Sequence, residues 1–339
     1  MANRLATFGN DLYTGKRSFD FVGKRNIWYF IIALLVLLSI AIPIAKGGFN
    51  FGIEFRGGSQ FVVTSVDNAT QEPAIEAVAS VVPDAVARVT TVGDSGVRVQ
   101  TDQLSQAENR EVASALAEAY SVPESEVTSS FIGPVWGADV TRQTIQGLVV
   151  FLLLAAIGMA LYFRTWKMSL AAIAALLVDL VITVGVYAAT DFEITPAAVI
   201  GILTILAYSL YDTVVVFDKI RENTTEDAVK SKHTFAESTN LAVNQTLVRS
   251  INTSVVAVLP VAAILFIGSF VLGADTLRDI SLALFIGILV GTWSTVFLAA
   301  PMYVQFRQGE KEVVRHDKSV LAAREKAAAS AAAAEAVTA

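Results

Sequence analysis

Long uncharged stretches dominate the pattern of hydrophobic and polar positions along the chain. Six stretches of 19 to 27 residues are almost entirely apolar: 27–45, 143–163, 168–190, 194–217, 250–274 and 280–306. A helix that crosses the ~30 Å hydrocarbon core of a bilayer needs about 20 apolar residues. Each stretch is long enough, so the pattern predicts six transmembrane helices and an integral membrane protein.

Residues 48–142, between the first two apolar stretches, follow a different pattern. Short runs rich in β-branched residues predict strands at 60–65, 87–92, 97–101 and 127–132. Apolar residues three or four apart predict helices at 71–82 and 105–120, and a loop at 93–96 predicts a hairpin. The resulting order, β-α-β-β-α-β, is typical of a ferredoxin-like α+β domain.

The distribution of charge predicts which side of the membrane each segment occupies. Of the 25 Lys and Arg residues, 18 fall in residues 1–26, 164–167, 219–249 and 307–339. Basic residues tend to remain on the cytoplasmic side, so both termini are expected there. Residues 48–142, with 13 acidic residues against 5 Arg, are expected outside the cytoplasm. The first apolar stretch is longer than the core of a signal peptide, which predicts an uncleaved anchor.

The predicted organisation is a membrane all-α six-helix bundle with an inserted α+β ferredoxin-like domain. Residues 1–26 form a cytoplasmic N-terminal segment and residues 27–47 the first transmembrane helix. Residues 48–142 form the extracytoplasmic domain, and residues 143–306 contain transmembrane helices two to six. Residues 307–339 form an Ala-rich cytoplasmic tail, to which the sequence assigns no function.

The composition argues against several classes of chemistry. The 339 residues include no Cys and two His, His233 and His316, both in predicted cytoplasmic segments. A thiolate metal site or a Cys nucleophile is therefore excluded, and no catalytic or metal site is expected. There is no phosphate-binding P-loop and no G-x-S-x-G nucleophile motif. The net charge of −6 gives no reason to expect nucleic acid binding. We therefore do not expect an enzyme.

The main candidate for function is an acidic residue inside the fourth span. Asp212 lies seven residues before Lys219, which places it ~10 Å from the expected cytoplasmic interface. An ionised carboxylate at the centre of a bilayer costs ~2.5–3.5 kcal/mol or more, and no predicted span contains Lys or Arg. The acid must stay protonated, be hydrated, or meet a cation from a second protein. Tyr208 and Ser209 share its helix face and could donate hydrogen bonds.

We interpret Asp212 as an ion or proton site; the alternative is a hydrogen-bonded acid that only fixes helix packing. Asp179, near the middle of the third span, is a second relay candidate, and a structural role is an equal alternative. Asp218 is a third candidate at the membrane interface, where acids are ordinary. Supporting polar residues, which could line a hydrated path or simply pack helices, are Ser254, Thr292 and Ser294.

Four short motifs stand out along the chain: FGIEFRGG at 51–58, GPVWG at 133–137, YSLYDTVVVFDKIREN at 208–223 and GTWST at 291–295. Together they resemble the SecF family, the smaller half of the SecD–SecF protein-export pair. Two positions differ from the family pattern, because Tyr211 replaces a usual Asn and Val178 replaces a frequent His. A relay through those two side chains is not expected in this chain.

The resemblance implies a fold related to half of a resistance–nodulation–division transporter. It also implies a partner, SecD, and a role in which the proton-motive force helps translocating preproteins out of the SecYEG channel. Protons, or sodium ions, would be the coupling ion, with no other cofactor, in a chain surrounded by membrane lipid. Two rival interpretations are a proton-driven exporter of lipids or drugs, which usually has twelve spans, and a scaffold that transports nothing.

Overall fold

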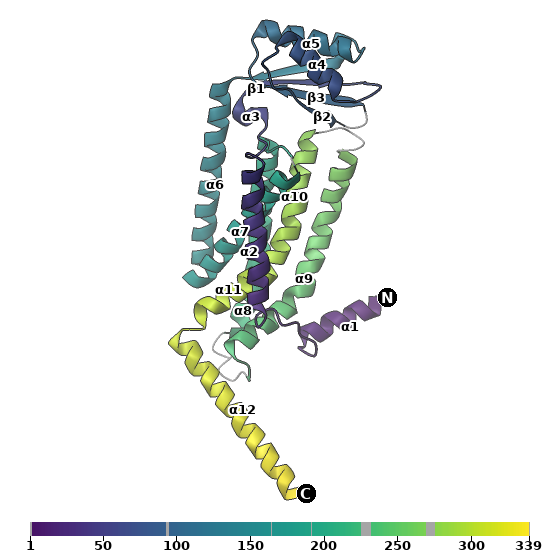
Figure 1. Cartoon of the computed structure of the whole chain (residues 1–339). Helices are drawn as coiled ribbons and strands as arrows, with labels where there is room; N and C mark the ends of the chain where they lie inside the picture. Colours follow the sequence, from purple (N-terminus) through teal and green to yellow (C-terminus); the bar gives the residue numbers. More distant parts are fainter. Residues whose placement is uncertain are drawn as a thin grey trace.

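The computed structural model describes residues 2–92, 95–163, 165–190, 192–224, 232–268 and 275–338. The molecule is elongated, with a small sheet domain at one end and helix α12 (Lys311–Thr338) at the other (Figure 1). A bundle of long helices lies between them. We call the two ends of this bundle the domain end and the tail end. Helix α1 (Ala2–Tyr13) projects sideways from the bundle near the tail end.

Six helices in the described residues are long and apolar enough to cross a membrane, as the sequence predicts. Five of them are α2 (Arg25–Ala45), α6 (Pro134–Phe163), α7 (Trp166–Thr190), α8 (Pro196–Thr224) and α9 (Phe235–Ala263), which continues into a π-helical turn, η3 (Ile264–Gly268). The sixth consists of α10 (Asp275–Ser294), a π-helical turn, η4 (Thr295–Ala299), and α11 (Ala300–Arg307).

Several helices begin well before the boundaries that the sequence predicts. Helix α6 includes Asp139 and Arg142 ahead of the predicted start at 143, and α9 begins 15 residues before the predicted start at 250. A charged residue ends an apolar stretch, whereas a helix extends beyond the apolar core until a cap or a break stops it. Residues 269–274 of the predicted fifth span lie outside the described residues.

Glycines allow α8 and α10 to pack closely at the centre of the bundle. An added Cβ on Gly201 would lie 2.8 Å from the Cβ of Ala283, and one on Gly287 would lie 2.5 Å from Cγ1 of Ile205. Small residues at such crossings let helix backbones approach in membranes. Helices α2, α6 and α9 expose most of their apolar surface, which suits lipid or a second membrane protein.

The sheet domain contains four antiparallel strands in the order β2-β3-β1-β4. Its elements are α3 (Ile53–Arg56), β1 (Gly58–Val63), α4 (Glu72–Val81), β2 (Arg88–Val92), β3 (Gly96–Thr101), α5 (Gln106–Ala119), η1 (Glu124–Glu126) and β4 (Val127–Ile132). The predicted strands and helices are observed within a few residues of their expected bounds, and residues 93–94 of the predicted hairpin loop lie outside the described residues.

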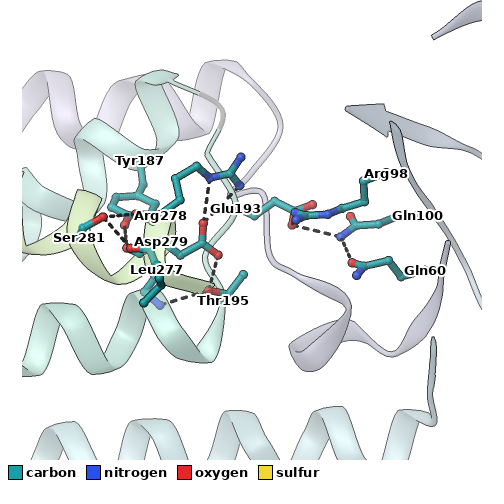
Figure 2. Close-up of polar contacts among 11 residues, drawn as sticks. Gln60, Arg98, Gln100, Tyr187, Glu193, Thr195, Leu277, Arg278, Asp279 and Ser281 are labelled. Carbon is teal, nitrogen blue, oxygen red and sulfur yellow. Dashed lines mark hydrogen bonds and ion pairs between the residues drawn. The ribbon is translucent and has the colours of Figure 1, made fainter. Parts of the chain in front are cut away.

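Side chains alternate between the two faces of this sheet. One face carries Phe61, Val97 and Val99, which are fully buried beneath α4 and α5 (Figure 1). The opposite face carries Arg98 and Gln100, which are also buried although polar. Polar residues on the second face are buried because this face of the sheet meets the domain end of the bundle (Figure 2).

Two consecutive glycines connect α3 to β1 in conformations that other residues rarely adopt. Gly57 has φ 77° and ψ 166°, and Gly58 has φ 139°. An added Cβ on Gly58 would lie 2.5 Å from the carbonyl oxygen of Thr101 in the neighbouring strand β3. Residues forced into such regions carry about 1–3 kcal/mol of strain.

We therefore expect Gly58→Ala to lower the thermal unfolding temperature of the purified chain by several degrees. Gly133→Ala is the matched control, because an added Cβ there meets nothing within 4 Å. Equal unfolding temperatures for the two variants would contradict the strain argument.

Candidate functional site

Asp212 of α8 is buried inside the bundle, with 5% of its surface exposed. Its Oδ1 accepts a hydrogen bond of 2.9 Å from the hydroxyl of Ser250 on α9. Its Oδ2 is also buried and accepts no hydrogen bond from the described residues. A buried carboxylate oxygen without a donor is costly, so this oxygen is a natural position for a proton or a bound cation.

Asp179 of α7 is the second buried acid, with 3% of its surface exposed. Its Oδ2 accepts a hydrogen bond of 2.6 Å from the hydroxyl of Ser209 on α8, and the side chain of Ser294 on α10 lies beside the same carboxyl group. Its Oδ1 is buried and has no donor among the described residues. Three helices therefore meet at this carboxylate.

Further hydroxyl groups lie on the same four helices near the two carboxylates, and we call the whole set of polar residues the polar seam. The hydroxyls of Thr213 and Thr295 lie 2.9 Å apart, and those of Ser254 and Thr292 lie 2.5 Å apart. Ser254 also donates to the backbone oxygen of Ser250. The polar seam comprises Asp179, Ser209, Asp212, Thr213, Ser250, Ser254, Thr292, Ser294 and Thr295. Hydroxyls both donate and accept hydrogen bonds, so the seam has the groups needed to hold or pass a proton.

The local structure of α10 brings these groups together. An added Cβ on Gly291 would lie 2.9 Å from the Cβ of Ser209 and 3.6 Å from Oδ2 of Asp179. The π-helical turn η4 begins at Thr295, immediately after Ser294. Single π-helical turns occur often at functional sites. Gly291 can be recognised in the sequence as a position where helices could pack closely. The change from α-helix to π-helix at η4 has no comparable signal in the sequence.

Two side chains that could donate hydrogen bonds to Asp212 donate none to it. Ser209 donates to Asp179 instead, and the hydroxyl of Tyr208 is buried without a hydrogen-bond partner among the described residues. Three residues turn a helix by about 300°, which leaves Ser209 and Asp212 about 60° apart around α8. That angle is enough for Ser209 to face α7 while Asp212 faces α9.

Asp218 does not take part in the polar seam. It lies near the tail end of α8, and its Oδ2 accepts a hydrogen bond of 2.7 Å from the hydroxyl of Tyr162 on α6. The pair is exposed, so the structure gives Asp218 the surroundings of an ordinary interfacial acid.

Arg249 is a functional candidate that the apolar pattern did not reveal. Arg249 lies inside α9, one residue before Ser250 and therefore just ahead of the apolar stretch 250–274, which contains no Lys or Arg. Its charge acts on the Asp212 carboxylate, and its guanidinium lies 3.4 Å from the Tyr211 hydroxyl. Arg249 is therefore a positive charge of this chain itself near Asp212.

A capping signal in the sequence could have revealed the true start of α9. Thr234 accepts a hydrogen bond from the backbone N–H of Glu237, whose side chain accepts one from the backbone N–H of Thr234. A Thr followed three residues later by Glu is the sequence signature of such a start. It places position 249 inside the helix.

Among the described residues, no group of three or more His, Asp or Glu side chains could hold a metal ion.

A second polar group of residues lies where the sheet domain meets the bundle (Figure 2). We call it the domain-end cluster: Glu54, Gln60, Arg98, Gln100, Tyr187, Glu193, Thr195, Arg278 and Asp279. Glu54 and Arg98 lie in the domain, whereas Glu193 and Thr195 lie between α7 and α8. Several of these side chains line a cavity of about 350 Å³. Glu54 lies in the FGIEFRGG motif at 51–58, whereas no pattern in the sequence marked the other members of the cluster.

Glu54 has a raised pKa in this cluster. Burial raises the pKa of its carboxyl group above the ordinary value, and the nearby carboxylates of Glu193 and Asp279 add to the effect, with partial compensation from a backbone hydrogen bond and from Arg98. The folded chain therefore holds this proton to a higher pH than the unfolded chain. The contribution of Glu54 to the free energy of unfolding is fully present below the pKa of the unfolded chain. This contribution is lost as the pH rises through the raised pKa of the folded chain.

The variant Glu54→Gln keeps a neutral side chain at every pH. We expect it to unfold at a higher temperature than the wild type at pH 8, with a difference that shrinks toward pH 4. Thermal unfolding across this pH range measures the effect, with Glu76→Gln on the exposed side of α4 as control. A difference that does not change with pH would contradict the prediction.

Comparison with known families agrees with the observed fold. The family model for the C-terminal region of the protein export membrane proteins SecD and SecF matches residues 111–309, and the SecD/SecF GG motif matches residues 44–68. The second match contains the glycine pair at 57–58.

Curated relatives cover nearly the whole chain. The SecF protein translocase subunit of Streptomyces coelicolor is 41% identical over 96% of this chain and 87% of its own length. The SecF subunit of Mycobacterium tuberculosis strain H37Rv is 38% identical over 93% of this chain and 73% of its own length.

Solved structures of SecDF share the fold. The crystal structure of SecDF from Thermus thermophilus, a translocon-associated membrane protein, aligns with a TM-score of 0.73 at 30% identity. The alignment covers 86% of this chain and 39% of SecDF. A second SecDF structure, in a super-membrane-facing form, aligns with a TM-score of 0.61. With six membrane-crossing helices, a small sheet domain and these matches over most of its length, the chain belongs to the SecF family of protein-export membrane proteins.

Proposed function

We propose that this chain works with SecD at the SecYEG channel and uses the proton-motive force to promote preprotein translocation and release. The observation that carries the proposal is the polar seam. It holds two buried carboxylates, each with one oxygen that lacks a donor among the described residues, inside apolar helices. Ionisable groups at such positions are rare and typically mark ion or proton pathways in membrane proteins.

The coupling ion would reach Asp212 and Asp179 through the hydroxyl groups of the seam. A proton needs only a chain of donors and acceptors, which these hydroxyls supply; a sodium ion is the alternative. One elementary charge that crosses a potential of 100 mV releases about 2.3 kcal/mol, enough to shift a conformational equilibrium. Arg249 would stabilise the ionised form of Asp212 after the proton leaves.

A second subunit would complete the transporter. The chain corresponds to 39% of SecDF, which supports a paired arrangement in which SecD supplies a matching half. The combined fold would then resemble a resistance–nodulation–division transporter, with the sheet domain as its ferredoxin-like outer part. Tyr211 is 55% exposed and Val256 on α9 is 69% exposed, so this side of α8 and α9 offers a surface to SecD.

Reconstitution tests the proposed function. Proteoliposomes that contain SecYEG and SecD, with or without this chain, would be given a proton gradient and a labelled preprotein. We expect the gradient to increase preprotein translocation only when the chain is present. Equal stimulation in both preparations would contradict a role in gradient-driven export.

The proposal also fixes the orientation of the chain in the cell membrane. Both termini would lie in the cytoplasm and the sheet domain outside it, because 18 of the 25 basic residues fall in segments that would then be cytoplasmic. The chain contains no Cys, so single Cys residues can be labelled without background.

An impermeant thiol reagent applied to intact cells should label Ser105→Cys, at the start of α5, and not Ser330→Cys, in α12. Both sites are exposed, and labelling after lysis controls for reactivity. The reverse pattern would show that the orientation is wrong.

A further inference from the structure

The two helices that carry the buried acids are joined by a short loop at the domain end. Helix α7 carries Asp179 and α8 carries Asp212, and the described residues 192–195 lead into α8 at the domain end. The segment that leads from α2 into the sheet domain holds this loop through its backbone. Gly52 N–H donates to the oxygen of Ile194 at 3.1 Å, and Ile194 N–H donates to the oxygen of Asn50 at 2.8 Å.

Side chains of the sheet contact the same loop at Glu193. Nη1 of Arg98 lies 3.6 Å from Oε2 of Glu193, and Nε2 of Gln100 donates to that oxygen at 3.1 Å (Figure 2). Gln100 also donates to Gln60 on β1, which ties the contact to two strands. Glu193 is 8% exposed and Arg98 is 5% exposed. A buried charge that loses its partner is strongly unfavourable. Separating the loop from the sheet would leave Arg98 and Glu193 in that state, so we expect the two to move together.

Helix α10 contacts Thr195 of this loop and Tyr187 near the end of α7, both through Asp279. The Thr195 hydroxyl donates to Oδ2 of Asp279 at 2.9 Å, and the Tyr187 hydroxyl donates to the backbone oxygen of Asp279 at 3.0 Å (Figure 2). Helix α10 also supplies Ser294, beside Asp179 in the seam. The loop thus joins three of the four helices of the polar seam to the sheet domain.

We propose that Arg98 and Glu193 form the mechanical link that transmits movements of the α7–α8 pair, caused by ion binding in the polar seam, to the sheet domain. Both are positioning residues, because neither lies in the seam. The link rests on the proposed function, since it requires an ion-driven movement. A contact that only stabilised the fold would, when lost, reduce both ion movement and export. Loss of the proposed link should reduce gradient-driven export while ion movement continues.

Two measurements on one set of proteoliposomes test this link. SecYEG, SecD and the full chain would be reconstituted as wild type, Glu193→Gln, Arg98→Glu and the charge exchange Arg98→Glu with Glu193→Arg. Gradient-driven proton flux and preprotein translocation would be measured in parallel. We expect Glu193→Gln and Arg98→Glu to keep more than half of the proton flux but to lose most gradient-driven translocation. The charge exchange should restore part of the translocation.

A distance measurement reports on the link independently of activity. Spin labels at Ser80→Cys in α4 and Thr190→Cys at the end of α7 are both exposed. Glu193→Gln should broaden the distance distribution between them, and the charge exchange should narrow it again. Glu222→Gln, an exposed acid near the tail end of α8, is the matched control.

The possible failures are distinguishable. Wild-type translocation by Glu193→Gln would overturn the link, as would a parallel loss of proton flux and translocation, because a structural anchor predicts the latter. Absence of proton flux in the wild type would instead contradict the proposed function, and the link would fall with it.

Discussion

Asp212→Asn should reduce export under a proton gradient to the level seen without a gradient, while folding and partner binding remain intact. Asn is nearly isosteric with Asp and can still accept the hydrogen bond from Ser250, but it cannot bind and release a proton. The substitution also removes a buried negative charge, which is costly inside a membrane. The loss should therefore appear in gradient-driven export and not in protein level.

A graded series makes this prediction specific. Asp212→Glu should keep some function because it still titrates, although its side chain is one methylene longer. Asp179→Asn should have a smaller effect, and Asp218→Asn the smallest, because Asp218 is a partly exposed acid paired with Tyr162. Translocation into membrane vesicles, with the gradient present or collapsed and protein levels measured in parallel, provides the test. Wild-type export by Asp212→Asn would leave the scaffold interpretation standing.

Gly287→Val should have the largest effect on stability. The side chain of Ile205 on α8 packs directly against α10 at this glycine, where an added Cβ would lie 2.5 Å from Cγ1 and Cγ2 of Ile205. A branched side chain has no room there, and overpacking of a well-packed core typically costs about 1–3 kcal/mol. The two helices should separate, and Gly291 and Ser209, one turn away, should lose their contact. We expect a lower unfolding temperature in detergent and a loss of export.

Matched variants separate crowding from a general effect of Val. Gly158→Val is the control, because an added Cβ on this residue of α6 meets nothing within 4 Å. The double variant Gly287→Val with Ile205→Ala should recover part of the lost stability, since it removes the atoms in the way. Equal unfolding temperatures for Gly287→Val and Gly158→Val would show that this crossing is not tightly packed.

The elements of the fold could be predicted because each depends on a local pattern. Six apolar stretches and four β-branched runs appear in the sequence and again in the structure. The ends of the helices could not be read in the same way. A charge such as Arg249 ends an apolar stretch but does not end α9, because the capping residue Thr234 lies 15 residues earlier. A boundary placed at each charge therefore leaves out the cation that acts on Asp212.

The candidate site was predicted only in part, for a similar reason. An acid inside an apolar stretch is conspicuous, so Asp179 and Asp212 could be singled out. Which hydroxyl serves which acid depends on how α8 is rotated against its neighbours, and Ser209 therefore donates to Asp179. The charged pair of the domain-end cluster had no local signal, since Arg98 and Glu193 lie 95 positions apart and are brought together only by the docking of the sheet domain.

Proton movement through the polar seam is best tested by a flux measurement on the isolated complex. Proteoliposomes that contain the chain and SecD would enclose a pH-sensitive dye, and an imposed membrane potential would drive protons inward in sodium-free buffer and again with sodium added. We predict a proton flux in the wild type that Asp212→Asn abolishes and that sodium does not change. Equal proton flux in the wild type and Asp212→Asn would contradict the assignment of Asp212 as the proton site.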